Sequence, residues 1–174
     1  MIETIETDRL IMIPYTLEQM EFAVLSPELA ASSIGAVFTE FGNDDHGISS
    51  EKRVYQQRAQ LIKNDPETWM YSTMWQIILK ETFEIVGEFG CKGIQPDGES
   101  EIGYSVREKF RRVGIMTEAL NAFVDFVTQR GEIMKISAYT EGFNAASIRV
   151  LRKTGFQYCG EKYSYGYWIK SICE

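Results

Sequence analysis

The stretch "EIGYSVREKFRRVGIMTEAL", residues 101–120, decides how this chain folds, because it passes from a strand through a basic turn into a helix. Residues 101–106 are apolar and β-prone, which favours a strand. Three arginines and a lysine precede Gly114, and apolar residues such as Met116 and Ala119 then recur at helical spacing. A helix N-terminus exposes unpaired N–H groups and the positive end of the helix dipole. The turn therefore predicts an anion-binding site.

Both the backbone and the side chains of this turn suit a phosphate group. The expected backbone donors are Val113, Gly114, Ile115 and Met116. Gly114 lets the backbone approach an oxygen without a Cβ in the way, while Arg111 and Arg112 add charge-assisted hydrogen bonds. The turn lacks G-x-x-x-x-G-K-[ST], which excludes a P-loop ATPase. The alternative is that the basic residues lie on a solvent-exposed loop and bind no ligand.

The composition predicts a single domain, residues 1–174, because the chain is 44% apolar and too short for two sizeable cores. A net charge of −7 disfavours nucleic-acid binding. The chain contains no run of about 18 apolar residues and its start does not resemble a signal peptide, so we expect a cytoplasmic protein that does not bind membranes. Cys91, Cys159 and Cys173 are scattered and His46 is the sole histidine, so no metal site is expected.

The remaining sequence predicts an α/β fold with one mixed sheet of six to seven strands and helices on both faces. Thr16 and Gln19 form a capping box at the start of a helix, and Asn144 caps a later one. Residues 26–49 are rich in small and polar residues, and "NDDHGISS", residues 43–50, reads as loop. The predicted strands lie near 9–15, 71–80, 84–94, 101–106 and 134–140, with two more after residue 156, and the predicted helices at 16–25, 50–64, 115–130 and 145–153.

Three segments resemble the GNAT superfamily of acetyl-CoA-dependent N-acetyltransferases. Residues 111–116, "RRVGIM", resemble its phosphate-binding motif [QR]-x-x-G-x-[GA], although Met116 departs from the last position. With the following "TEA", this form is similar to the RimJ/RimL-like branch of ribosomal-protein N-terminal acetyltransferases. Residues 144–156, "NAASIRVLRKTGF", resemble N-x-x-S-x-x-x-L-x-K-x-G-F, and residues 6–19 resemble the T-E-R-L-x-L-R-P start. Residues 26–70 match nothing specific.

The resemblance implies a GNAT-like fold in which the strands at 101–106 and 134–140 splay apart to admit acetyl-CoA. The pantetheine arm would then pair with the backbone of Tyr104, Ser105 and Val106, and an N–H near Val106 would polarise the thioester carbonyl. The implied cofactor-binding residues are Tyr104, Ser105, Val106, Arg111, Arg112, Val113, Gly114, Ile115, Met116, Thr117, Asn144 and Ser147.

Three residues are candidates for proton transfer. The resemblance points to Ser147 as partner of the leaving thiolate; alternatively, Ser147 only completes the first helical turn, and Tyr139 or a tyrosine of residues 163–167 takes that role. Glu88 and Glu101 lie within apolar strands, where partial burial would favour proton uptake from an amine near neutral pH. Either carboxylate alternatively has a structural role.

The resemblance implies a monomer or homodimer that transfers acetyl to a primary amine. In this it is most like the enzymes that acetylate protein N-termini. An α-amine is easier to deprotonate than a lysine, because its pKa is about 7.7 rather than about 10.4. Glu40, Asp44 and Asp45 would attract a cationic acceptor, or they form a solvated loop. The alternatives are an N-acetyltransferase acting on a polyamine, antibiotic or amino acid, and a non-catalytic acyl-CoA sensor.

Overall fold

The described strands form one mixed sheet of eight, in the order β1-β2-β3-β4-β5-β6-β8-β7. The computed structural model describes residues 2–40 and 47–172, with side chains from residue 52 onward in the second of these segments. Neighbouring strands are antiparallel except β5 and β6, which run parallel. The strands are β1 (Ile5–Glu6), β2 (Leu10–Pro14), β3 (Met74–Leu79), β4 (Ile85–Cys91), β5 (Glu99–Val106), β6 (Lys135–Thr140), β7 (Gln157–Lys162) and β8 (Tyr165–Ser171).

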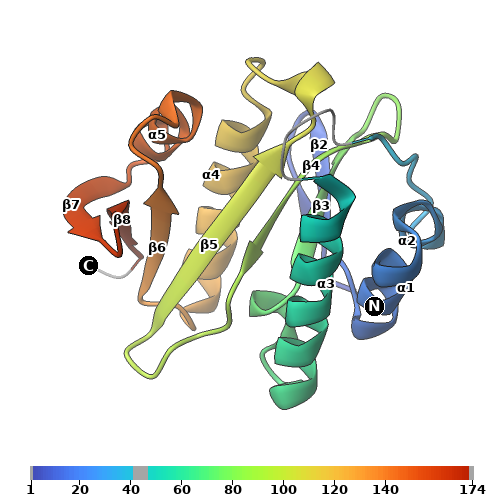
Figure 1. Ribbon diagram of the computed structural model, residues 1–174, viewed down its shortest axis with the longest axis horizontal. Helices are drawn as coiled ribbons and strands as arrows, with labels where there is room; N and C mark the ends of the chain where they lie inside the picture. The colour runs from blue at the N-terminus through green and yellow to red at the C-terminus, as the bar shows by residue number, and fades with distance from the viewer. Residues whose placement is uncertain (1, 41–46, 173–174) are drawn as a thin grey trace.

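Helices cover both faces of this sheet (Figure 1). They are α1 (Leu17–Leu25), α2 (Pro27–Ser33), α3 (Gly47–Asn64), α4 (Ile115–Arg130) and α5 (Ala145–Lys153), with short 3-10 helices at Trp69–Tyr71 and Glu108–Phe110. α3 lies in front of the sheet in Figure 1 and α4 behind it, where α4 and α5 share one apolar cluster. Among the described residues, no helix is both long and apolar enough to cross a membrane.

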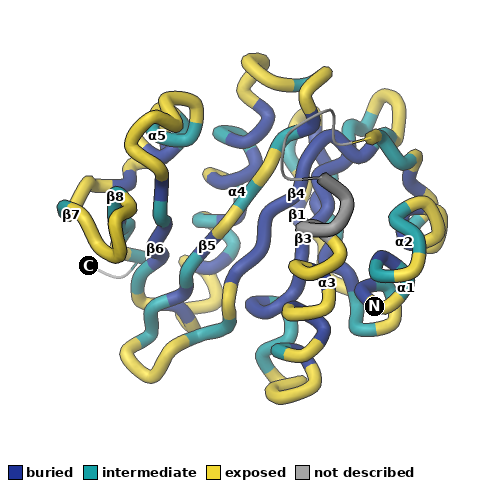
Figure 2. Tube along the Cα trace, viewed as in Figure 1, coloured by how far each residue is buried: buried dark blue, intermediate teal, exposed yellow. Residues whose placement is uncertain are grey.

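The core behind the sheet is built from the apolar face predicted for α4. Trp75 stacks on Phe89 with ring centroids 5.9 Å apart, and Phe89 contacts Phe123 of α4 at 4.8 Å. Figure 2 shows the buried backbone concentrated in the central strands, and every residue of β4 is buried. This packing fixes β4 and β5 as a rigid support for the site.

The helix boundaries follow the local signals in the sequence. Thr16 Oγ1 accepts from Gln19 N at 3.3 Å while Gln19 Oε1 accepts from Thr16 N at 2.9 Å, which confirms the capping box. Gly131 closes α4 with a φ of 68°, a left-handed value that glycine adopts readily.

Two expectations about the elements were wrong. No helix was expected between residues 26 and 49, yet this segment contains α2, in which Ser26 Oγ accepts from Leu29 N and Pro27 takes the first helical position. The capping signal was present, but the small residues of α2 give no clear apolar stripe. The eighth strand, β1, has two residues, too few to produce a strand pattern. Asp44 and Asp45 lie outside the described residues.

The parallel strands β5 and β6 separate after three paired positions. Their pairing runs Glu99↔Lys135, Ser100↔Ile136 and Glu101↔Ser137, although β5 continues to Val106. β4 pairs with β5 up to Val106, so β5 stays in the sheet while β6 diverges. Figure 1 shows the two ribbons spreading apart from this point. The splayed strand pair is thereby confirmed, with its apex at Glu101.

Candidate active site

The basic turn ends at a left-handed glycine that caps α4. Gly114 has a φ of 82° and supplies no side-chain cap, and the helix begins at Ile115. The N–H groups of the first turn, at Ile115, Met116 and Thr117, have no acceptor within the helix. The backbone therefore presents donors at the open end of the splay, where the sequence predicted an anion site.

The four basic residues of the turn divide into two pairs. Arg111 and Arg112 are exposed beside Gly114, and Arg111 Nε donates to Val106 O at 3.1 Å. Lys109 forms an ion pair with Glu84 at 3.1 Å, and Arg107 is buried with its Nη2 atom 3.9 Å from Glu88 Oε2. The exposed positive charge beside Gly114, where the sequence predicts an anion site, therefore comes from Arg111 and Arg112.

Arg9, from the far end of the chain, also stabilises this turn, although it was not among the predicted site residues. Its guanidinium donates to Val113 O at 3.2 and 3.3 Å and to Glu118 Oε2 at 2.8 Å, while Thr7 Oγ1 donates to Glu118 Oε1 at 2.5 Å. Burial alone would raise the pKa of Glu118, but these hydrogen bonds from Thr7 and Arg9 hold that pKa below its ordinary value. The opposite charges of Arg9 and Glu118, which lie in two of the segments that resemble the family, were the signal that could have predicted this contact.

Ser147 contacts a residue on the far side of the splay. Asn144 Oδ1 accepts from Ser147 N at 3.0 Å, so the expected helix cap exists. Ser147 Oγ also lies 2.8 Å from the hydroxyl of Tyr104 on β5. Burial raises the pKa of Tyr104 to about 12, while the hydrogen bond to Ser147 acts in the opposite direction. The phenol therefore keeps its proton at neutral pH. Tyr104 was expected to contribute its backbone, and its hydroxyl was missed.

Glu88 is buried between the sheet and α3. Its Oε2 atom accepts from the Tyr55 hydroxyl at 2.7 Å and from Gln76 Nε2 at 3.2 Å, and Arg107 lies nearby. Burial, followed by the Glu88 charge, raises the pKa of Tyr55 well above its ordinary value. Arg58 of the same helix donates to the carbonyl groups at the end of β4. These contacts give Glu88 the role of an anchor between α3 and the sheet.

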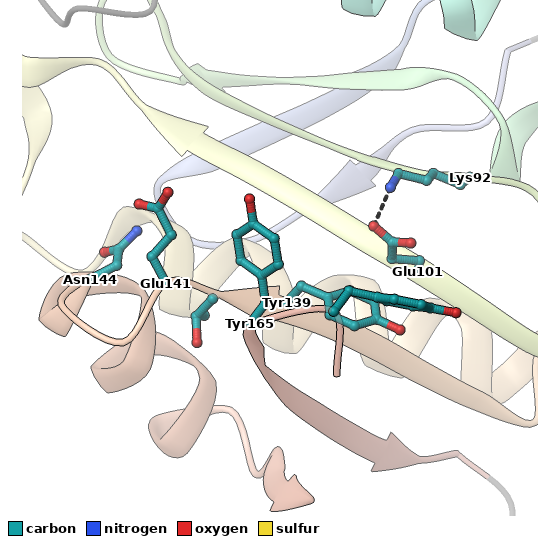
Figure 3. A pocket seen from close by; sticks show the side chains of 8 residues that line it. Lys92, Glu101, Tyr139, Glu141, Asn144 and Tyr165 are labelled. Atoms are coloured by element: carbon teal, nitrogen blue, oxygen red, sulfur yellow. Dashed lines mark hydrogen bonds and ion pairs between the residues drawn. The ribbon is translucent and has the colours of Figure 1, made fainter. Parts of the chain in front are cut away.

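Glu101, by contrast, lines a pocket of about 540 Å³ at the apex of the splay. Figure 3 shows the tyrosine rings of this apex pocket between Glu141 and Asn144 at one end and the Lys92–Glu101 ion pair at the other. Tyr139 comes from β6, and Tyr163 and Tyr165 from the β7–β8 hairpin. The apex pocket lies beside the last paired position of β5 and joins one candidate base with three phenols and a second carboxylate.

The sequence matches the family described as "Acetyltransferase (GNAT) domain" over residues 9–157. The chain belongs to the GNAT acetyltransferase family. It is similar to the uncharacterized N-acetyltransferase YjdG of Bacillus subtilis (strain 168), at 33% identity over 114 residues, which cover 64% of this chain and 66% of that protein. The uncharacterized N-acetyltransferase YoaA of the same organism is 26% identical over 174 residues, covering 96% of this chain and 90% of that protein.

The fold of this GNAT chain is also that of solved structures. RimL, described as a ribosomal L7/L12 alpha-N-protein acetyltransferase in complex with coenzyme A, superimposes with a TM-score of 0.69 at 19% identity, covering 98% of each chain. The family predicted from the three motifs is therefore confirmed, as is the GNAT-like fold.

The two described cysteines of this GNAT protein differ in exposure. Cys91 is buried, and burial raises its pKa to about 11. Cys159 is an exposed free thiol. No group of three histidine, cysteine or acidic side chains in the described segments is placed to hold a metal ion. Cys173 and His46 lie outside them.

Proposed function

We propose that this GNAT protein transfers the acetyl group of acetyl-CoA to a primary amine, and that the amine is a protein N-terminus. One observation carries the proposal: β5 leads from the apex pocket at Glu101 toward the N-terminus of α4, which Gly114 caps. A strand rises about 3.3 Å per residue, so the free stretch from Glu101 to Val106 spans about 16 Å. An extended carrier lying along it reaches from one site to the other.

The residues at the open end suit acetyl-CoA, which when bound supplies an acetyl thioester. The amides of residues 113–117 with Arg111 and Arg112 would hold the diphosphate, because they combine helix-terminus donors with two cations. The backbone of Tyr104, Ser105 and Val106 would hold the pantetheine amides as an added strand, because β6 has left that edge of β5. Asn144 would lie beside this channel at the start of α5.

We assign proton uptake from the amine to Glu101. Glu101 lines the apex pocket, whereas Glu88 already accepts from Tyr55 and Gln76 beneath α3. A proton would move from the amine nitrogen to a Glu101 carboxylate oxygen, directly or through water. For an α-amine with a pKa near 7.7 the neutral form at pH 7 costs about 1 kcal/mol, against about 4.6 kcal/mol for a lysine-type amine. A partly exposed carboxylate therefore suits an N-terminal amine better.

We assign the leaving thiolate to Ser147, supported by Tyr104. Ser147 Oγ would give its proton to the leaving sulfur and regain one from the adjoining Tyr104 hydroxyl, which solvent would reprotonate. A backbone N–H near Val106 would stabilise the developing oxyanion. Tyr139 lines the apex pocket, and we assign it to binding of the acceptor rather than to the thiolate.

The likeness in fold to RimL, a ribosomal L7/L12 alpha-N-protein acetyltransferase, supports a protein N-terminus as the acceptor. The single-domain organisation, the cytoplasmic location, the lack of nucleic-acid, membrane and metal partners, and a monomeric or homodimeric state remain predictions from the sequence.

A thiol-release assay with acetyl-CoA tests the function. The acceptors are a peptide with a free N-terminal serine, the same peptide with its N-terminus blocked, spermidine and kanamycin. We expect release with the free peptide and none with the blocked one. Release only with spermidine or kanamycin would replace the proposed acceptor by a small molecule. Acetyl-CoA binding without release for any amine would favour the sensor.

A further inference from the structure

The apex pocket already holds an ammonium group, that of Lys92. Lys92 follows β4, and its backbone N donates to Glu101 O at 3.0 Å, so the two residues lie side by side. The Lys92 ammonium donates to Glu101 Oε1 within the pocket (Figure 3). The Lys92 side chain is 54% exposed and that of Glu101 31% exposed, so another molecule can reach both.

The other walls of the apex pocket also favour a positive charge. Glu141 adds a second carboxylate, while Lys92 is the sole basic residue among the described pocket-lining side chains. The rings of Tyr139, Tyr163 and Tyr165 offer faces that attract cations. One such contact exists at the rim, where Lys162 Nζ lies 5.5 Å from the centroid of Tyr163.

We propose that Lys92 is a specificity-determining residue that occupies the acceptor's ammonium site and must be displaced from Glu101 when the acceptor binds. The inference rests on the proposed function, because it takes the acceptor to enter at the apex pocket. The acceptor class is a cationic primary ammonium, since the exchange replaces one ammonium by another at Glu101 and keeps the charge of the pocket constant. Lys92 thereby weakens binding of every cationic acceptor and disfavours those with few other contacts.

The first test is a comparison of Lys92→Met with Lys92→Arg in the thiol-release assay. Exposed ion pairs contribute little to stability, so removing the competing charge should lower the KM for the serine peptide by about two- to fivefold. Lys92→Arg keeps the cation and should keep the KM near the wild-type value. The matched control is Lys63→Met, because Lys63 is 48% exposed and pairs with Glu21 at 2.8 Å between α3 and α1. Lys63→Met should leave the KM unchanged.

The second test does not depend on turnover. A serine peptide whose terminal nitrogen carries two methyl groups keeps its positive charge but cannot be acetylated. Calorimetry with coenzyme A present should give a Kd about two- to fivefold lower for Lys92→Met than for the wild type or Lys63→Met.

The outcomes separate this inference from the proposed function. Tighter binding of the dimethyl peptide to Lys92→Met without any thiol release would support the displacement of Lys92 and overturn the catalytic proposal. Normal turnover with an unchanged or raised KM and Kd in Lys92→Met would overturn the inference and leave the acetyltransferase proposal standing. A lowered KM in Lys92→Arg equal to that in Lys92→Met would also overturn it, because the cation would then be irrelevant.

Discussion

Gly114 shows how a single residue can set the geometry of the proposed anion site. Its φ of 82° belongs to the left-handed region, which costs a residue with a Cβ roughly 1–2 kcal/mol. A Cβ at this position would have Arg9 Nη2 as its nearest neighbour, at 3.7 Å, so space is available and backbone strain is the main penalty. The strain would act on the amides that begin α4.

We expect Gly114→Ala to lower stability by about 1–2 kcal/mol and to weaken coenzyme A binding at least tenfold, because strain at the cap shifts the donor amides. Gly131→Ala is the matched control: it lies at the other end of α4 with a φ of 68° and has no atom within 4 Å of its Cβ position. It should lose similar stability and keep the affinity. Calorimetry and thermal unfolding measure both, and equal affinities in the two variants would contradict the site.

Ser147 and Tyr104 provide a second prediction at the residue scale. Ser147→Ala should lower kcat by about a hundredfold with little change in coenzyme A affinity, since proton transfer typically contributes a factor of this size. A normal kcat would show that another group protonates the thiolate.

The raised pKa of Tyr104 adds a pH dependence. Because this pKa is about 12 rather than 10.0, the folded state holds the phenol proton more tightly than the unfolded state. The resulting stabilisation is complete below about pH 10 and is lost as the pH rises toward about 12. Tyr104→Phe should remove this part of the stability loss at alkaline pH, as measured by thermal unfolding between about pH 8 and about pH 11.

At the scale of elements, the two candidate carboxylates, Glu88 and Glu101, occupy different structural positions. Glu88 joins β4 to Gln76 of β3 and Tyr55 of α3, so it fixes a helix on a sheet. Glu101 marks the point where β5 and β6 part. The first position is enclosed by its partners, and the second opens into a pocket.

We therefore expect opposite effects from the two isosteric substitutions. Glu88→Gln removes a buried charge opposite Arg107 and should cost about 3 kcal/mol of stability, with kcat within about threefold of wild type. Glu101→Gln should cost less than about 1 kcal/mol and lower kcat by about a hundredfold. Chemical denaturation and thiol release measure the two quantities. A catalytic loss in Glu88→Gln with intact stability would return the base assignment to Glu88.

At the scale of the whole molecule, the splay leaves one edge of β5 available for a ligand backbone. Hydrogen exchange should slow on coenzyme A addition at residues 102–106 and at the start of α4, because bound amides pair with that edge. The strands β1 to β3 lie away from the splay and serve as the internal control. Protection confined to other elements would place the carrier elsewhere.

The sequence by itself determined the local features of this GNAT protein. The glycine-ended basic turn, the apolar face of α4 and the caps at Thr16 and Asn144 are set by neighbours a few residues apart, so periodicity and turn chemistry reveal them. Together with three motifs, they predicted the family. Even α2 carried its capping signal at Ser26, although its small residues masked it.

Only the tertiary structure decided which side chains meet. Arg9 braces Glu118 across 109 positions, and Tyr104 reaches Ser147 across 43. The facing of Glu88 toward α3 and of Glu101 into the apex pocket depends on strand register and on which helix covers which face. Such contacts arise from packing between distant segments, and no local pattern in the chain encodes them.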